Sequence, residues 1–264
     1  MTTLHGSALD LARRAIVRRV AEALSPAGVP VMPLKGALLA AIVYDDPAER
    51  GGEDVDLLVP EDRFAEALGA LASAGFAAHD PHPNPSERTL VLPAVGIEID
   101  LHRALFAPGR FRLATRDVFA RSREDVALFG ARVRLPDPAD AYAHAVGHDA
   151  AAHLPAGGPW TARDLDLLAA RGRLDPSLVA TRLAESGLAR AARFTLGPLA
   201  GADPFARDVL AALPPDPLGR LLVGVARSLA SGPLGAVAGH LTNDSLPAAA
   251  RSAALAWRAR RALR

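Results

Sequence analysis

The sequence predicts an α+β fold in which a domain of strands and helices over residues 1–136 is followed by an all-helical domain over residues 137–264. Two observations predict it. Up to Pro136, short β-rich runs alternate with segments of helical periodicity, whereas beyond that residue helical patterns dominate to the end of the chain. Half of the 264 residues are hydrophobic, which is ample for a real core.

The first domain is expected to begin with a helix over residues 7–24. Leu9, Ile16 and Leu24 belong to its apolar stripe, and Ser7 is the expected N-cap. The segments expected next are a strand over 29–34, a helix over 36–44, a strand over 54–59 and a helix over 61–74 that is closed by Gly75.

Two hairpins complete the first domain, and helices make up the second. The first hairpin pairs residues 89–92 with 97–101, and the second pairs 126–129 with 132–135. The first four helices expected in the second domain are 138–153, 161–170, 176–186 and 189–196, followed by Ala-, Leu- and Arg-rich helices.

Composition excludes several function classes. With 30 Lys+Arg against 29 Asp+Glu, the formal charge is +1, so the basic excess that a dedicated clamp for long nucleic acid needs is missing. No apolar run reaches the ~18 residues of a membrane helix, and the N-terminus lacks a signal peptide pattern. There is no cysteine, which makes the cytoplasm the expected compartment.

Acidic residues form the strongest chemical pattern. In a strand over residues 54–59, Asp54 and Asp56 share one face. Alternation in a strand over 97–102 likewise puts Glu98, Asp100 and His102 on one face. Two neighbouring carboxylates repel each other unless a cation lies between them, and hard oxygen ligands favour Mg²⁺ or Mn²⁺. A third carboxylate from the second strand would complete a two-metal site.

A phosphate site is expected where the strand over 29–34 runs into the next helix. The free N–H groups and dipole of a helix start favour an anion. Gly36 permits close approach, Lys35 adds charge as the single lysine of the chain, and Arg50 can reach the same phosphates.

Two further patterns have plainer interpretations. Asp164 and Asp166 fall in a helix, where residues two apart point about 200° apart and cannot share an ion. His144 and His148, followed by His153 in the same expected helix, have the spacing of a zinc pair, but no third ligand of the usual type is nearby. Partly buried polar residues are therefore favoured over a zinc site.

Taken in order, the motifs resemble a known family. They are Leu34-Lys35-Gly36, then Tyr44, Arg50, Asp54-Val-Asp56-Leu-Leu-Val, Gly75-Phe76 and Ile99-Asp100-Leu-His102. This set is similar to the nucleotidyltransferase-fold proteins of the DNA polymerase β-like superfamily, and more narrowly to a poorly characterised bacterial branch of it. The resemblance covers roughly residues 5–200.

The resemblance implies a nucleotidyltransferase-fold, mixed β-sheet domain and a two-metal, Mg²⁺- or Mn²⁺-dependent transfer of a nucleoside monophosphate. The group would move from an NTP to a hydroxyl of a small molecule or peptide, with release of pyrophosphate. Asp54, Asp56 and Asp100 match the metal-binding, catalytic carboxylates. Lys35, Gly36 and Arg50 would bind the phosphates. His102 would orient Asp100 or bind the acceptor, or serve as a structural histidine.

Two departures from the superfamily pattern leave alternatives open. Ala37 replaces the usual serine after the glycine, and Glu53 replaces a small residue before the first aspartate. The first removes a hydroxyl that contacts phosphate. The alternatives are a non-catalytic nucleotide-binding or regulatory module with the same fold, and a phosphotransferase that attacks a different phosphorus atom.

Overall fold

The computed structural model describes residues 2–52, 54–79, 85–93, 96–152, 158–232 and 235–262. The chain divides into two compact units, one made of Met1–Leu105 and Ala114–Asp137, the other of Phe106–Leu113 and Pro138–Arg264. Within the described residues, no helix combines the length and the apolar character that a membrane crossing requires.

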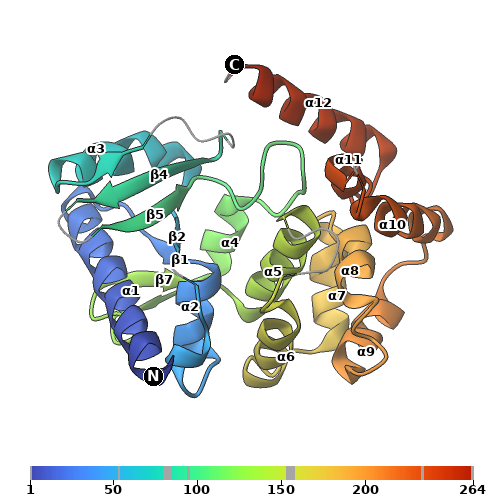
Figure 1. The fold of residues 1–264 in the computed structure, drawn as a ribbon, viewed down its shortest axis with the longest axis horizontal. Helices are drawn as coiled ribbons and strands as arrows, with labels where there is room; N and C mark the ends of the chain where they lie inside the picture. The colour runs from blue at the N-terminus through green and yellow to red at the C-terminus, as the bar shows by residue number, and fades with distance from the viewer. Residues whose placement is uncertain are drawn as a thin grey trace. The chain divides into compact units, whose positions relative to one another are not determined.

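A five-stranded mixed sheet lies at the centre of the first unit (Figure 1). Its strand order is β1-β2-β5-β4-β3, and only the β2/β5 pair is parallel among these neighbours. The strands are β1 (Met32–Pro33), β2 (Val55–Leu58), β3 (Ala77–Ala78), β4 (Glu87–Leu92) and β5 (Ile97–His102). All four residues of β2 are buried, which makes this short strand part of the core.

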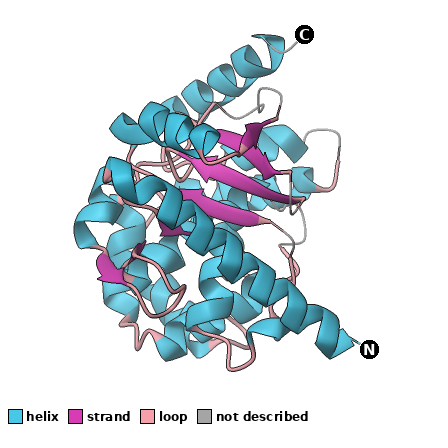
Figure 2. Cartoon of the chain, turned by 90° about the vertical axis from the view of Figure 1, so that its left-hand side faces the viewer, coloured by secondary structure: helices cyan, strands magenta, loops and turns pink. Residues whose placement is uncertain are grey.

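Helices surround this sheet. Figure 2 shows α1, the helix beside the N label, passing across the strands, and α1 packs against β2, α2 and α3. The helices of this unit are α1 (Thr2–Leu24), α2 (Lys35–Ile42), α3 (Phe64–Ser73) and α4 (Thr115–Arg121), with short 3-10 turns at Ser25–Ala27, Pro47–Glu49 and Glu61–Arg63. A separate ribbon pairs β6 (Arg123–Asp125) with β7 (Val133–Leu135).

The described part of the second unit contains helices and no strand, which confirms the predicted α+β class with a helical C-terminal region. Its helices are α5 (Pro138–Ala152), α6 (Thr161–Arg171), α7 (Pro176–Glu185), α8 (Ala189–Leu196), α9 (Pro204–Ala212), α10 (Pro217–Ala230), α11 (Gly235–His240) and α12 (Leu246–Ala262).

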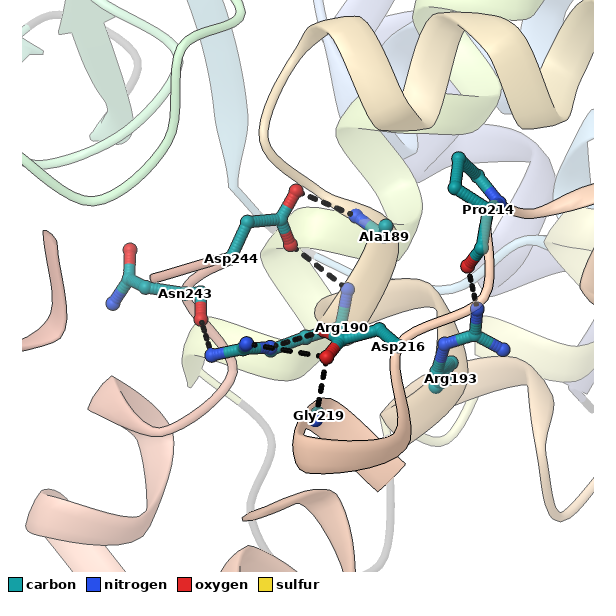
Figure 3. Close-up of polar contacts among 8 residues, drawn as sticks. All are labelled: Ala189, Arg190, Arg193, Pro214, Asp216, Gly219, Asn243 and Asp244. Carbon is teal, nitrogen blue, oxygen red and sulfur yellow. Dashed lines mark hydrogen bonds and ion pairs between the residues drawn. The ribbon is translucent and has the colours of Figure 1, made fainter. Parts of the chain in front are cut away.

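Arg190 joins three segments of this helical unit (Figure 3). Its Nε donates to Asp216 just before α10, at 2.7 Å, and its Nη1 donates to the carbonyl oxygen of Asn243. The Asp244 carboxylate accepts from the N–H groups of Ala189 and Arg190, so it caps α8 from another part of the chain. These contacts fix the start of α8.

Several local predictions were wrong. Helix α1 begins before Ser7, so Ser7 lies inside the helix and is not its N-cap. The first strand of the second hairpin is Arg123–Asp125, and residues 126–129 form the turn, because the ribbon places polar residues in the strand and apolar ones in the loop. The short elements α4 and β3 were not predicted. Glu53 and His153 lie outside the described residues.

Candidate active site

The acidic residues come together on one face of the parallel strand pair. Asp56 of β2 lies opposite Asp100 of β5 in the register, so the two side chains leave the sheet on the same face. Asp54 immediately precedes β2 and interacts electrostatically with both. The structure therefore brings together the three carboxylates that the strand alternation singled out.

Lys35 and His102 hold the Asp56 carboxylate. Lys35 Nζ donates to Asp56 Oδ1 at 2.6 Å, and His102 Nε2 lies 3.0 Å from the same oxygen. The Asp56 side chain is only 8% exposed. Burial alone would raise the pKa of Asp56, but the hydrogen bonds and charges of His102 and Lys35 outweigh it and hold that pKa well below its ordinary value. Asp56 is thus a buried anion at neutral pH.

His102 lies between two carboxylates. Its Nδ1 is 3.0 Å from Glu87 Oε2, on β4, while Nε2 faces Asp56. Burial opposes the charged imidazole, yet hydrogen bonds to both carboxylates raise the pKa of His102 above its ordinary value. His102 therefore orients Asp56. The sequence analysis offered Asp100 or an acceptor as its partner, or a structural role.

Glu87 and Thr89 were missed by the sequence analysis. The Thr89 hydroxyl donates to Asp100 Oδ1 at 2.7 Å. The predicted hairpin already contained the signal, since pairing its innermost residues, Leu92 and Ile97, places Thr89 opposite Asp100 and Glu87 opposite His102. Each functional side chain of β5 is thus held by its cross-strand neighbour.

The negative charges of two neighbouring carboxylates destabilise the ionised form of Asp54. The residue is exposed, and partial burial of its carboxyl group raises its pKa, with further contributions from the charges of Asp56 and Asp100. A bound divalent cation would relieve this repulsion, and three carboxylates supply the hard oxygen donors that Mg²⁺ or Mn²⁺ prefers. No three acidic or imidazole groups of the described chain stand close enough to hold an ion as they are. In this structure the Lys35 ammonium is the cation beside Asp56.

The start of α2 lies beside the acidic face. Lys35 is the first residue of this helix and has φ of 44°, a left-handed conformation that is uncommon outside glycine. The left-handed backbone at this helix start is therefore at Lys35, and Gly36 has no positive φ. A Cβ added at Gly36 would come within 3.7 Å of Arg50 Nη1 and 3.9 Å of Arg13 Nη1, so two guanidinium groups approach the helix here. The structure places Lys35, Gly36 and Arg50 together, as a phosphate site requires.

The remaining sequence candidates lie in the helical unit. Asp164 is buried and Asp166 exposed on α6, so they point in different directions, as predicted. His144 is buried on α5 and His148 is half-buried, with 6.2 Å between their ring centres. His144 also makes an edge contact with Phe106.

The chain was compared with family profiles, curated proteins and solved structures. A family profile described as "uncharacterised nucleotidyltransferase" matches residues 8–200. Among solved structures, the chain is similar to the antibiotic-resistance factor ANT(2'')-Ia, with 12% identity, a TM-score of 0.48, and coverage of 67% of this chain and 95% of that one. No curated protein matches the chain.

Proposed function

The chain belongs to the family of uncharacterised nucleotidyltransferases, and from that membership we propose that it transfers the nucleoside monophosphate part of an NTP to an acceptor hydroxyl. The acceptor oxygen attacks the α-phosphorus, the bond from that phosphorus to the bridging oxygen of the β-phosphate breaks, and pyrophosphate leaves. The near-neutral charge of the chain favours a small molecule or a peptide as the acceptor over a long polynucleotide.

The observation that carries this proposal is the pairing of Asp56 with Asp100 beside the start of α2. Mg²⁺ or Mn²⁺ held by Asp54, Asp56 and Asp100 would stabilise the charge that develops on the attacking and leaving oxygens. Asp100, held by the Thr89 hydroxyl, accepts the acceptor's proton. The Glu87–His102 pair keeps Asp56 ionised and fixed in direction.

Lys35, Gly36 and Arg50 bind the phosphates in this proposal. The N–H groups in the first turn of α2 have no acceptor inside the helix and favour an anion. Lys35 opens this turn and its Nζ donates to Asp56, so its ammonium can act on a phosphate and on the carboxylate. Preorganised positive groups of this kind stabilise a transition state whose charge spreads over phosphate oxygens.

Substitution of Asp56 tests the proposal. Asp56→Asn keeps the shape of the side chain and removes the charge, and Asp166→Asn, on the exposed face of α6, is the matched control. Each protein is incubated with Mg²⁺, α-labelled NTP and a pool of hydroxyl compounds and peptides, and labelled adducts and pyrophosphate are measured. We expect the wild type and the control to form both products, and Asp56→Asn to lose at least about 10²-fold in rate. An Asp56→Asn protein as fast as the wild type would contradict the assignment.

Ala37 favours a second candidate, a nucleotide-binding module without transfer, because this position lacks the hydroxyl found in the wider superfamily. Thermal stabilisation by each of the four NTPs, with and without Mg²⁺, separates the two candidates when combined with the product assay. Stabilisation without pyrophosphate release would support the module. Label transferred from the γ-phosphate instead of the α-phosphate would identify a phosphotransferase.

A further inference from the structure

Arg13 is a buried cation whose environment does not balance its charge. It lies on α1, is 2% exposed, and donates through Nη2 to the carbonyl oxygen of Arg50 at 2.9 Å. Its Nε and Nη1 have no hydrogen-bond acceptor among the residues that the structure describes. A buried guanidinium with two unused donors costs free energy, so such a group is expected to have a ligand in the functioning protein.

Nearby charges make the need for an anion stronger. Burial lowers the pKa of Arg13, and the positive charge of Arg50 lowers it further, against an opposing contribution from Asp10. Asp10 is already bonded to Arg14 Nε at 2.7 Å. Two guanidinium groups therefore approach the partly exposed Gly36, and the carboxylate that acts on Arg13 is itself bonded to Arg14.

One of the unused donors of Arg13, Nη1, lies at the start of α2. Arg13 Nη1 and Arg50 Nη1 are 3.9 and 3.7 Å from the point that a Cβ of Gly36 would occupy. Because residue 36 is glycine, this point is left open between the guanidinium groups and the first turn of α2. The helix dipole and both guanidinium groups thus act on one place, where they favour a ligand with several negative charges.

We propose that Arg13 is a phosphate-binding residue that, together with Arg50 and the first turn of α2, holds the terminal phosphates of the NTP and the pyrophosphate product. This inference rests on the proposed nucleotidyl transfer. The fork of Arg13 offers two N–H groups to phosphate oxygens and so supplies the contact that the missing hydroxyl at Ala37 would otherwise make. Its bond to the Arg50 carbonyl holds the loop that carries the second guanidinium.

The test uses inorganic pyrophosphate and inorganic triphosphate as probes, titrated into the full-length protein by calorimetry with and without Mg²⁺. The variants are Arg13→Met and Arg13→Lys. Arg18→Met is the matched control, because Arg18 lies on the same helix with an exposed side chain. We expect pyrophosphate binding to weaken about tenfold or more in Arg13→Met, less in Arg13→Lys, and not in the control.

The stability of the ligand-free protein separates binding from a structural role. If Arg13 serves a ligand, Arg13→Met removes an uncompensated buried charge and keeps or raises the thermal midpoint. A lowered midpoint with unchanged pyrophosphate affinity would overturn the inference, and Arg13→Lys allows the same comparison if Arg13→Met does not fold.

The pyrophosphate titration and the nucleotidyl-transfer assay test the two proposals separately. Loss of pyrophosphate binding in the Arg13 variants of a protein that transfers no nucleotide would support the site and reject the proposed reaction. Transfer with an unchanged KM for NTP in those variants would support the reaction and reject the site.

Discussion

Replacing Lys35 by methionine should destabilise the sheet unit and make its stability depend on Mg²⁺. The substitution removes the 2.6 Å bond to an Asp56 carboxylate that is 8% exposed, and leaves His102 as the remaining side chain bonded to it. Breaking a buried ion pair costs about 3–5 kcal/mol. Since the Lys35 side chain is 23% exposed and His102 keeps its bond, we expect a loss of about 2–3 kcal/mol in the free energy of unfolding.

Urea unfolding at pH 7, followed by circular dichroism, measures this loss, first without divalent metal and then with Mg²⁺. Metal should restore more stability to Lys35→Met than it adds to the wild type, because the ion replaces the missing ammonium. Lys35→Arg keeps the charge and should lose less free energy of unfolding than Lys35→Met. If Lys35→Met were as stable as the wild type without metal, the view of Lys35 as the counter-ion of Asp56 would be wrong.

Three further predictions concern the two units separately. The folded-state pKa of His102 is raised, so its contribution to stability is complete below about pH 6.5 and is lost as the pH rises through that folded-state pKa. Urea midpoints measured between pH 6 and 9 should therefore fall in the wild type and change less in His102→Gln. Gly147→Ala should destabilise the protein by about 1–3 kcal/mol, because its Cβ would come within 2.5 Å of Phe106, and an unchanged thermal midpoint would refute this. Gly224→Ala, with open space around it in α10, should stabilise by about 0.5–1 kcal/mol in the same measurement.

The acidic face was predictable because it depends on local rules. Alternation along a strand places Asp54 and Asp56 on one face, and Asp100 and His102 on one face, independently of contacts with the rest of the chain. A parallel pairing of the two strands then aligns Asp56 with Asp100. Most of the longer helices could also be predicted, since their apolar spacing repeats over successive turns, and α8 was predicted with its observed bounds.

What the sequence analysis missed depends on contacts between distant segments. Arg13 acquires its role only when α1 packs beside α2 and the loop at Arg50, and no local rule states that packing. A signal was nevertheless present, because Arg13 falls four residues after Leu9 and three before Ile16, within the apolar stripe of its helix. A charged residue inside such a stripe indicates a buried charge that requires a partner.

The grouping of Phe106–Leu113 with the helical unit has a consequence for how such chains can be recombined. The polypeptide changes unit three times, after Leu105, Leu113 and Asp137, and Phe106 lies on α5 through its ring contact with His144. A gene fusion that joins the sheet unit to a different helical unit at a single crossover near residue 137 would keep Phe106–Leu113 but lose the helices that this segment is grouped with. A chimaera that preserves these contacts exchanges residues 106–113 together with the helices.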